Sequence, residues 1–188
     1  VICQLYYSEK EASKWGEPIK MNDQINMSGY TTTQPTVGRE SKRNQEVVYF
    51  VSDRPEGKGG LDIWYTEYHA RTKRFRAPKN AGAAVNTPGT EFTPYYDAST
   101  HSLYFSTDGR VGLGGLDVYK IEGEKTKWSK DSIQHIGKAV NSPADDFDFV
   151  LNKDRRTGFL VSNREGGVAL MNATCCDDIY SFEFVEYV

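Results

Sequence analysis

The chain has 188 residues, of which 38% are hydrophobic and 13% aromatic, so it is long enough to bury one sizeable core. A mean hydropathy of -0.63, with no apolar run approaching ~18 residues, excludes a membrane-spanning helix from this sequence. The formal net charge of -3 gives no bulk attraction for nucleic acid or anionic lipid.

An aromatic hairpin pattern returns along the chain every 55 residues. Each copy contains an aromatic residue and, after it, a polar residue that closes the pattern. These pairs are Tyr49 and Asp53, Tyr104 and Asp108, and Phe159 and Asn163. Strand-like pieces separated by glycine-rich turns at this period predict a repeated β architecture, for which a β-propeller is the leading candidate.

The first residues fit the end of one repeat. Residues 4–18 (QLYYSEKEASKWGEP) align with residues 62–78 (DIWYTEYHARTKRFRAP), which follow the glycine-rich loop of the first complete repeat. The chain is therefore predicted to begin at the third strand of a blade, as a mature fragment of a longer protein.

The middle repeat has the clearest strand pattern. Residues 91–97 (EFTPYYD) predict a first strand, which Pro94 makes short or irregular, and residues 101–108 (HSLYFSTD) predict its hairpin partner. Glycines between Gly109 and Gly115 predict a tight loop into a third strand at 117–121, and a weaker fourth strand fits 127–134. Four antiparallel strands with short connections would make one propeller blade.

The last repeat carries an insertion of six residues, because Asp178 follows Asp117 by 61 residues instead of 55. Its third strand is predicted at 179–184. A turn with a shared asparagine also precedes each first strand, as INMSG, VNTPG and VNSPA in the three repeats.

The chain as a whole is predicted to be a single all-β domain: a β-propeller, or a propeller fragment, of four-stranded antiparallel blades. The predicted boundaries are residues 1–25 for the end of one blade, and 26–85, 86–140 and 141–188 for successive repeats. The domain is expected to be incomplete at the N-terminus. Further sequence or a partner would then complete the ring, since an open arc leaves strand edges unpaired.

Several motif strings together resemble a known repeat family. They are SDRPEGKGGLDIW, STDGRVGLGGLDVY, the leaders VNTPGTEFTP and VNSPADDFDF, and the ending SNREGG with DDIY. Over nearly the whole chain they resemble the TolB-type WD-like propeller repeats of outer-membrane-associated, OmpA-family proteins of the Bacteroidetes. Within that group the chain looks most like the PorE-like periplasmic component of the type IX secretion system.

The resemblance implies a protein-binding scaffold in the periplasm, associated with the outer membrane and with other cell-envelope proteins as partners. The sequence contains no lipobox cysteine, helical repeat or OmpA-like segment, so peptidoglycan would be reached only through a domain outside this chain. We expect no enzymatic activity, no cofactor, no metal ion, no nucleic-acid partner and no direct insertion into a membrane.

Polar residues at repeated positions are interpreted first as parts of the fold. Asp62, Asp117 and Asp178 precede the third strands, while Asp53, Asp108 and Asn163 close the second strands. A ring of carboxylates could hold Ca²⁺, but a residue repeated in every blade is spread around the ring. Aspartates in turns commonly accept hydrogen bonds from nearby backbone N–H groups, so we expect structural roles.

Catalytic groupings are sparse. His69, His101 and His135 occupy unrelated positions in the repeat, which argues against a histidine cluster. The densest acidic group includes Asp146 and Asp148, and a glycosidase needs two carboxylates that face a cleft. Strand alternation would place both on one face, where a solvated or loop-bonded role is favoured.

Two segments depart from the repeat and are candidate partner contacts. The basic turn contains Arg71, Lys73, Arg74 and Arg76, whose charge either protects an edge strand or binds an acidic protein. The insertion contains Val168, Leu170, Met171, Cys175 and Cys176. It either elaborates the packing or contacts another protein. Either of its cysteines could pair with Cys3 or with the other, which leaves at least one thiol unpaired within the chain.

The leading prediction is a binding and scaffolding module of a cell-envelope assembly such as the type IX secretion system. The alternative is a glycan-binding or glycan-processing propeller that uses Trp15, Trp64 and Trp128 as stacking platforms. Most aromatic residues recur at equivalent repeat positions, which favours a place in the core between blades.

Overall fold

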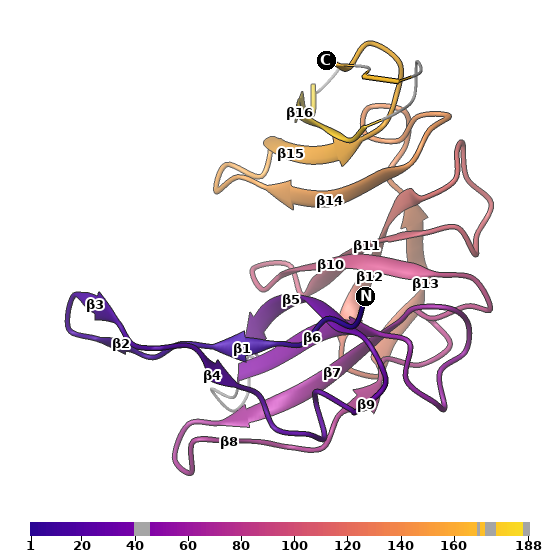
Figure 1. The fold of residues 1–188 in the computed structure, drawn as a ribbon. Coiled ribbons are helices and arrows are strands. Elements are labelled where there is room, and N and C mark those ends of the chain that lie inside the picture. The colour runs from indigo at the N-terminus through magenta and orange to yellow at the C-terminus, as the bar shows by residue number, and fades with distance from the viewer. Residues whose placement is uncertain (40–45, 169, 172–175, 186–188) are drawn as a thin grey trace.

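The computed structural model describes residues 1–39, 46–168, 170–171 and 176–185. Within these ranges the chain forms antiparallel β-sheets joined by turns and loops, and contains no helix (Figure 1). The predicted all-β class is confirmed.

The strands form four groups in chain order. The N-terminal pair consists of β1 (Tyr6–Tyr7) and β4 (Ile19–Lys20), with a hairpin of β2 (Lys10–Glu11) and β3 (Lys14–Trp15) between them. The first sheet contains β5 (Thr32–Arg39), β6 (Glu46–Ser52), β7 (Asp62–His69), β8 (Arg74–Phe75) and β9 (Lys79–Asn80). The second sheet contains β10 (Glu91–Asp97), β11 (Ser102–Thr107), β12 (Asp117–Glu124) and β13 (Lys127–His135). The third sheet contains β14 (Asp146–Leu151), β15 (Thr157–Ser162) and β16 (Asp178–Glu183).

The strand predictions for the middle repeat are confirmed. The first strand has the predicted bounds, and the third and fourth strands run on to Glu124 and His135. In the last repeat the predicted third strand is β16. Alternating apolar residues and short turn signals are local features, which is why the sequence alone located these strands.

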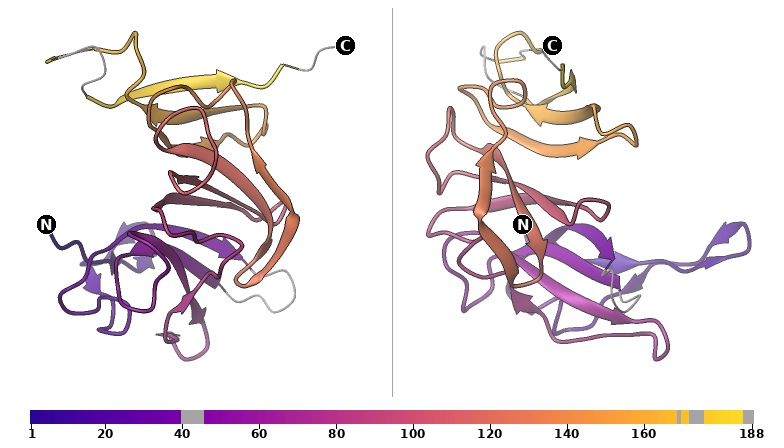
Figure 2. Two further views of the ribbon diagram at one scale, coloured as in Figure 1. Left: turned by 90° about the vertical axis from the view of Figure 1, so that its right-hand side faces the viewer. Right: turned by 180° about the vertical axis from the view of Figure 1, so that it is seen from behind.

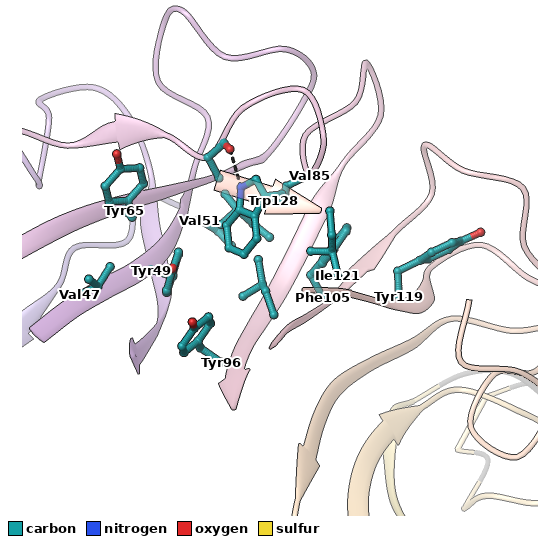
Figure 3. Close-up of a cluster of buried hydrophobic side chains, with 13 residues drawn as sticks. Val47, Tyr49, Val51, Tyr65, Val85, Tyr96, Phe105, Tyr119, Ile121 and Trp128 are labelled. Atoms are coloured by element: carbon teal, nitrogen blue, oxygen red, sulfur yellow. Dashed lines mark hydrogen bonds between the residues drawn. The ribbon is translucent and has the colours of Figure 1, made fainter. Parts of the chain in front are cut away.

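Side chains alternate between the two faces of each strand, so each sheet can pack against the one before it and the one after it in chain order (Figures 1 and 2). In β6, Tyr49 packs in the core that the first sheet shares with the second, while Phe50 packs toward the N-terminal pair. Figure 3 shows the first of these cores, in which Trp128 of β13 lies beside Tyr49 and Val85. A further core between the second and third sheets contains Tyr104, Val118, Phe149, Leu160 and Phe182.

A bulge recurs on the first strand of each sheet. Gln34, Thr93 and Asp148 have positive φ values of 50°, 45° and 49°, and the strand register shifts at each of them. The side chains link neighbouring sheets: Gln34 Oε1 accepts a hydrogen bond from the Thr93 N–H at 3.2 Å, and Thr93 Oγ1 accepts one from the Asp148 N–H at 3.0 Å. The first strands β5, β10 and β14 therefore lie side by side.

The bulge shows that the expected alternation of Asp146 and Asp148 is wrong. Asp146 is fully buried, with its carboxylate bonded to Ser142 and Arg164, whereas Asp148 is exposed. An extra residue at the bulge shifts the pleat, so the two carboxylates do not share a face.

Candidate functional site

The aspartates that precede the third strands accept hydrogen bonds from their own loops, as expected. Asp117 Oδ2 accepts from the N–H groups of Leu113 and Gly114, both at 3.0 Å. Asp178 Oδ2 accepts from the Val168 N–H at 2.7 Å, and Asp62 binds its own loop in the same way. Across the described ranges, no group of three or more His, Cys, Asp or Glu residues is arranged to hold a metal ion.

The residues that close the second strands tie each hairpin to its entry turn. Their Oδ1 atoms accept hydrogen bonds from backbone N–H groups at the start of the first strand: Asp53 from Thr31 at 2.7 Å, Asp108 from Thr90 at 2.6 Å, and Asn163 from Asp145 at 2.9 Å. These six repeated positions therefore hold loops in place.

The asparagine before each first strand has a role that the sequence analysis missed. Asn86 Oδ1 accepts from the Ile63 N–H at 2.9 Å, and Asn86 Nδ2 donates to the Ile63 carbonyl at 2.9 Å. Asn141 binds Val118 in the same way, and Asn26 binds Leu5. Asn86 and Asn141 thus join their repeats to the third strand of the preceding one, and Asn26 binds the residue just before β1. Its recurrence in the leader strings was the available signal.

An arginine after each second strand was also missed. Arg110 donates to the carbonyls of Ala84 at 2.8 Å and Val85 at 3.0 Å, immediately before the leader asparagine. Arg54 and Arg164 bind the corresponding carbonyls of their own repeats. Each guanidinium group also lies over an aromatic ring of its own repeat. The distances to the ring centroid are 5.1 Å for Arg54 over Trp64, 5.9 Å for Arg110 over Tyr119 and 5.0 Å for Arg164 over Tyr180.

The titratable groups inside the sheets are held by local hydrogen bonds. Glu91 is fully buried and accepts hydrogen bonds from the hydroxyls of Thr87 at 2.6 Å and Thr107 at 2.9 Å. Burial raises the pKa of the Glu91 carboxyl above its usual value, although these hydrogen bonds oppose the shift. His69 contacts Arg76, and His135 contacts Asp117, so these two histidines lie in separate sheets.

The basic turn faces acidic side chains of the same chain. Lys73 lies 3.1 Å from Glu9, and Arg76 lies 3.2 Å from Glu67. Arg71 and Arg74 are exposed. Two of the four basic candidates are therefore engaged in ion pairs within the molecule.

The insertion presents apolar side chains to solvent. Val168, Leu170 and Met171 are 70%, 78% and 85% exposed. Cys3 and Cys176 are exposed too, while Cys175 lies outside the described residues. The Val168 N–H bonds to the Asp178 carboxylate, so Val168 lies beside the start of β16.

An aromatic pocket of about 470 Å³ lies between the N-terminal pair and the first sheet. Its lining includes Tyr6, Tyr7, Trp15, Tyr68 and Phe75. Trp15 is 68% exposed on the hairpin that projects from the stack (Figure 1), so it lies outside the core expected for the recurring aromatic residues. Trp64 and Trp128 are buried, as expected.

Similarity to known proteins is found among solved structures. No family model matches the chain, and no curated protein matches it. Among solved structures, the chain is similar to the crystal structure of an N-acetylgalactosamine deacetylase from F. plautii in complex with blood group B trisaccharide. The TM-score is 0.47 and the identity 13%, over 81% of this chain and 51% of that chain, so this chain spans about half the length of that structure. A likeness at this level carries no argument about function.

No helix long and apolar enough to cross a membrane occurs in the ranges that the structure describes.

Proposed function

We propose that this chain is a non-catalytic protein-interaction scaffold. The observation that carries the proposal is the exposed apolar loop formed by Val168, Leu170 and Met171, which are at least 70% exposed. Apolar side chains gathered on a β framework are stabilised when a second surface removes them from water. The loop is therefore suited to contact another protein.

The placement of the carboxylates supports binding over catalysis. Asp62, Asp117 and Asp178 accept backbone hydrogen bonds, and Asp146 is buried against Arg164. A general acid or base must reach a substrate in a cleft, whereas the oxygen atoms that accept these bonds are engaged within the fold.

We also propose that the sheets are blades of a β-propeller. The first strands of consecutive sheets lie side by side, and each sheet packs its face on the next through a core of aromatic and aliphatic side chains. Radial repetition of small antiparallel sheets about their first strands is the arrangement of propeller blades.

The repeat motifs also support a proposal for where the protein is located in the cell. Their resemblance to TolB-type repeats supports a scaffold in the periplasm, next to the outer membrane, in an assembly such as the type IX secretion system. Its partners would be other cell-envelope proteins, and peptidoglycan would be bound through a separate domain.

Photo-crosslinking tests the loop directly. A photoreactive amino acid in place of Leu170 is expected to give a discrete crosslink to an envelope protein when the whole protein is produced in its own bacterium. Val111 is the matched control, because it is an apolar residue that is 94% exposed in the glycine-rich loop of the middle repeat. Identical products from the two positions, or none from Leu170, would reject the loop as a contact surface.

The aromatic pocket favours glycan binding as a second candidate function. Rings such as Trp15 and Tyr6 can stack on the apolar faces of sugars, and both are more than half exposed beside the pocket. If the pocket binds glycans, Trp15→Ala should weaken binding of soluble peptidoglycan fragments by about tenfold, or ~1.4 kcal/mol, in calorimetric titration. Val111→Ala serves as the control, and equal affinities for all three proteins would exclude this role for the pocket.

A further inference from the structure

A pocket with a basic lining lies between the N-terminal pair and the turn that joins β7 to β8. Its volume is about 340 Å³, at the lower end of the range for small-ligand sites. The residues that line this basic pocket are Tyr7, Lys20, Asn22, Lys73, Arg74 and Phe75. The rings of Tyr7 and Phe75 meet edge to face at 5.7 Å, and both also line the aromatic pocket. The two pockets therefore share one aromatic wall.

Lys20 occupies a position that recurs opposite the third strand of each repeat. The equivalent strand pairs are Tyr6 with Lys20, Trp64 with Asn80, and Tyr119 with His135. In the two later copies the side chain at this position contacts the aspartate before the third strand, Asp62 at 3.1 Å and Asp117 at 3.0 Å. Gln4 stands in the place of that aspartate at the N-terminal pair. The first copy thus combines a cation with the loss of the acidic partner.

Asn22 is a second departure from the repeat at the same pocket. The equivalent residues are Gly82 and Gly137, which have positive φ values of 92° and 83° and no side chain. Asn22 Oδ1 accepts hydrogen bonds from the N–H groups of Gln24 at 3.0 Å and Ile25 at 3.1 Å. These bonds orient the side-chain amide, and its Nδ2 group remains as a donor at the basic pocket.

Lys73 is engaged within the fold. Its ammonium lies 3.1 Å from the Glu9 carboxylate, which raises the pKa of Lys73 above its usual value. A similar pair forms one repeat later, where Lys125 of the β12–β13 turn lies 2.5 Å from Glu67 of β7. The contact of Lys73 with Glu9 is therefore assigned to the packing of neighbouring repeats, and its charge is compensated.

Lys20 and Arg74 carry the charge that remains at the basic pocket. Both are exposed, and neither forms an ion pair with another residue of the ranges that the structure describes. The whole chain has a net charge of -3, so this positive charge is a local feature. An ammonium and a guanidinium group at one pocket can bind a carboxylate or phosphate group through charge-assisted hydrogen bonds.

We propose that the basic pocket binds the acidic group of a carbohydrate, a carboxylate or a phosphate, between Lys20 and Arg74 with Asn22 as a further donor. The sugar ring would pack on the aromatic wall formed by Tyr7 and Phe75. A neighbouring sugar of the same chain would lie in the aromatic pocket. The proposal rests on the second candidate function, glycan binding, and adds the charge that the ligand carries.

An acidic polypeptide fits this pocket less well than an acidic sugar. A peptide carboxylate gains the same contacts with Lys20 and Arg74, but acidic side chains have no ring face to pack on Tyr7 and Phe75. The basic pocket also continues past its aromatic wall into a second pocket of about 470 Å³. Two pockets joined by an aromatic wall favour a ligand made of successive rings.

Calorimetric titration at low salt, where screening is weak, compares an acidic with a neutral tetrasaccharide. The acidic probe alternates glucuronic acid and N-acetylglucosamine, and the neutral probe contains N-acetylglucosamine alone. We expect the acidic probe to bind about tenfold more tightly or better. The double variant Lys20→Gln/Arg74→Gln should lose this preference while its far-UV circular dichroism spectrum stays unchanged. Equal affinity of the unaltered protein for the two probes would overturn the proposal.

Arg71→Gln is the matched control for the loss of charge. Arg71 is an exposed cation on the turn that precedes β8, but it does not line the basic pocket. Its replacement should leave the preference for the acidic probe unchanged. An equal reduction by Arg71→Gln and by Arg74→Gln would attribute the preference to general charge attraction and reject the pocket.

Smaller probes identify the acidic group and test the contribution of the sugar ring. Glucuronic acid, glucose 6-phosphate, inorganic phosphate and a tetraglutamate peptide are each titrated into the isotope-labelled protein and followed by NMR. Tighter binding of glucuronic acid or of glucose 6-phosphate assigns the carboxylate or the phosphate. Inorganic phosphate or tetraglutamate that binds as tightly as both sugars would reject a carbohydrate as the ligand.

The ratio of the two tetrasaccharide affinities separates this proposal from glycan binding at the aromatic pocket. Trp15 lines the aromatic pocket but not the basic pocket, so Trp15→Ala should weaken both probes alike and keep their ratio. A ratio that persists while Trp15→Ala has no effect would leave the acid site standing and reject the aromatic pocket. Equal affinities that both fall in Trp15→Ala would give the reverse result.

Discussion

Replacing Asn86 by leucine is expected to lower the free energy of unfolding by about 3 kcal/mol, since two buried backbone groups lose their side-chain partner. Asn86 is 1% exposed, and its amide makes both hydrogen bonds to Ile63 at 2.9 Å. The Ile63 carbonyl keeps its bond from the Ala81 N–H, but the Ile63 N–H is left without a partner. Urea unfolding followed by circular dichroism measures the change.

The matched control for this variant is Asn152→Leu. Asn152 is exposed near the β14–β15 turn, where it bonds to the Thr157 hydroxyl. We expect this substitution to change stability by less than about 0.5 kcal/mol. If Asn86→Leu were equally mild, the leader asparagine would not be what joins consecutive sheets.

Trp128→Ala is expected to cost about 4 kcal/mol, because it empties the middle of the core between the first and second sheets (Figure 3). The Trp128 ring lies 6.1 Å from that of Tyr49, and its Nε1 donates to the Ala81 carbonyl at 2.8 Å. The side chain therefore ties the outer strand of the second sheet to Ala81, in the segment that precedes that sheet. Thermal and urea unfolding should both show the loss.

Two further variants separate the contribution of ring packing from that of the hydrogen bond. Trp128→Phe keeps most of the ring packing but loses the hydrogen bond, so we expect a cost of about 1–2 kcal/mol. Trp15→Ala removes a tryptophan that is 68% exposed and should cost less than about 0.5 kcal/mol. A similar loss from Trp15→Ala and Trp128→Ala would contradict the assignment of Trp128 to the core.

The role of Asn86, the asparagine before the second sheet, could not be predicted from the sequence. Its recurrence was visible in three short strings, but Ile63 lies 23 residues before Asn86 and belongs to another repeat. A pairing of this kind depends on how the sheets stack, which no local pattern encodes. The guanidinium of Arg110 was missed for the same reason, since its acceptors are 26 and 25 residues away.

The bulge at Asp148 was unpredictable for a different reason. The residues at this position are Gln34, Thr93 and Asp148, which are all polar but carry different functional groups, and only the first two are followed by proline. The strand pattern therefore indicated regular alternation. The bulge instead buries Asp146 and exposes Asp148, so these two carboxylates do not face one cleft.

The sequence by itself determined the all-β class, the positions of the four strands of the middle repeat and the structural use of Asp62, Asp117 and Asp178. These follow from alternation and turn chemistry, which act over a few residues. Tertiary structure alone decided that Asn86 joins two sheets, that Trp15 lies in an open pocket, and that Ile179 remains exposed on an edge strand. Residues of one repeated type differ in these ways because burial and hydrogen bonding depend on the neighbouring sheet: Ile63 is 0% exposed, whereas Ile179 is 77% exposed.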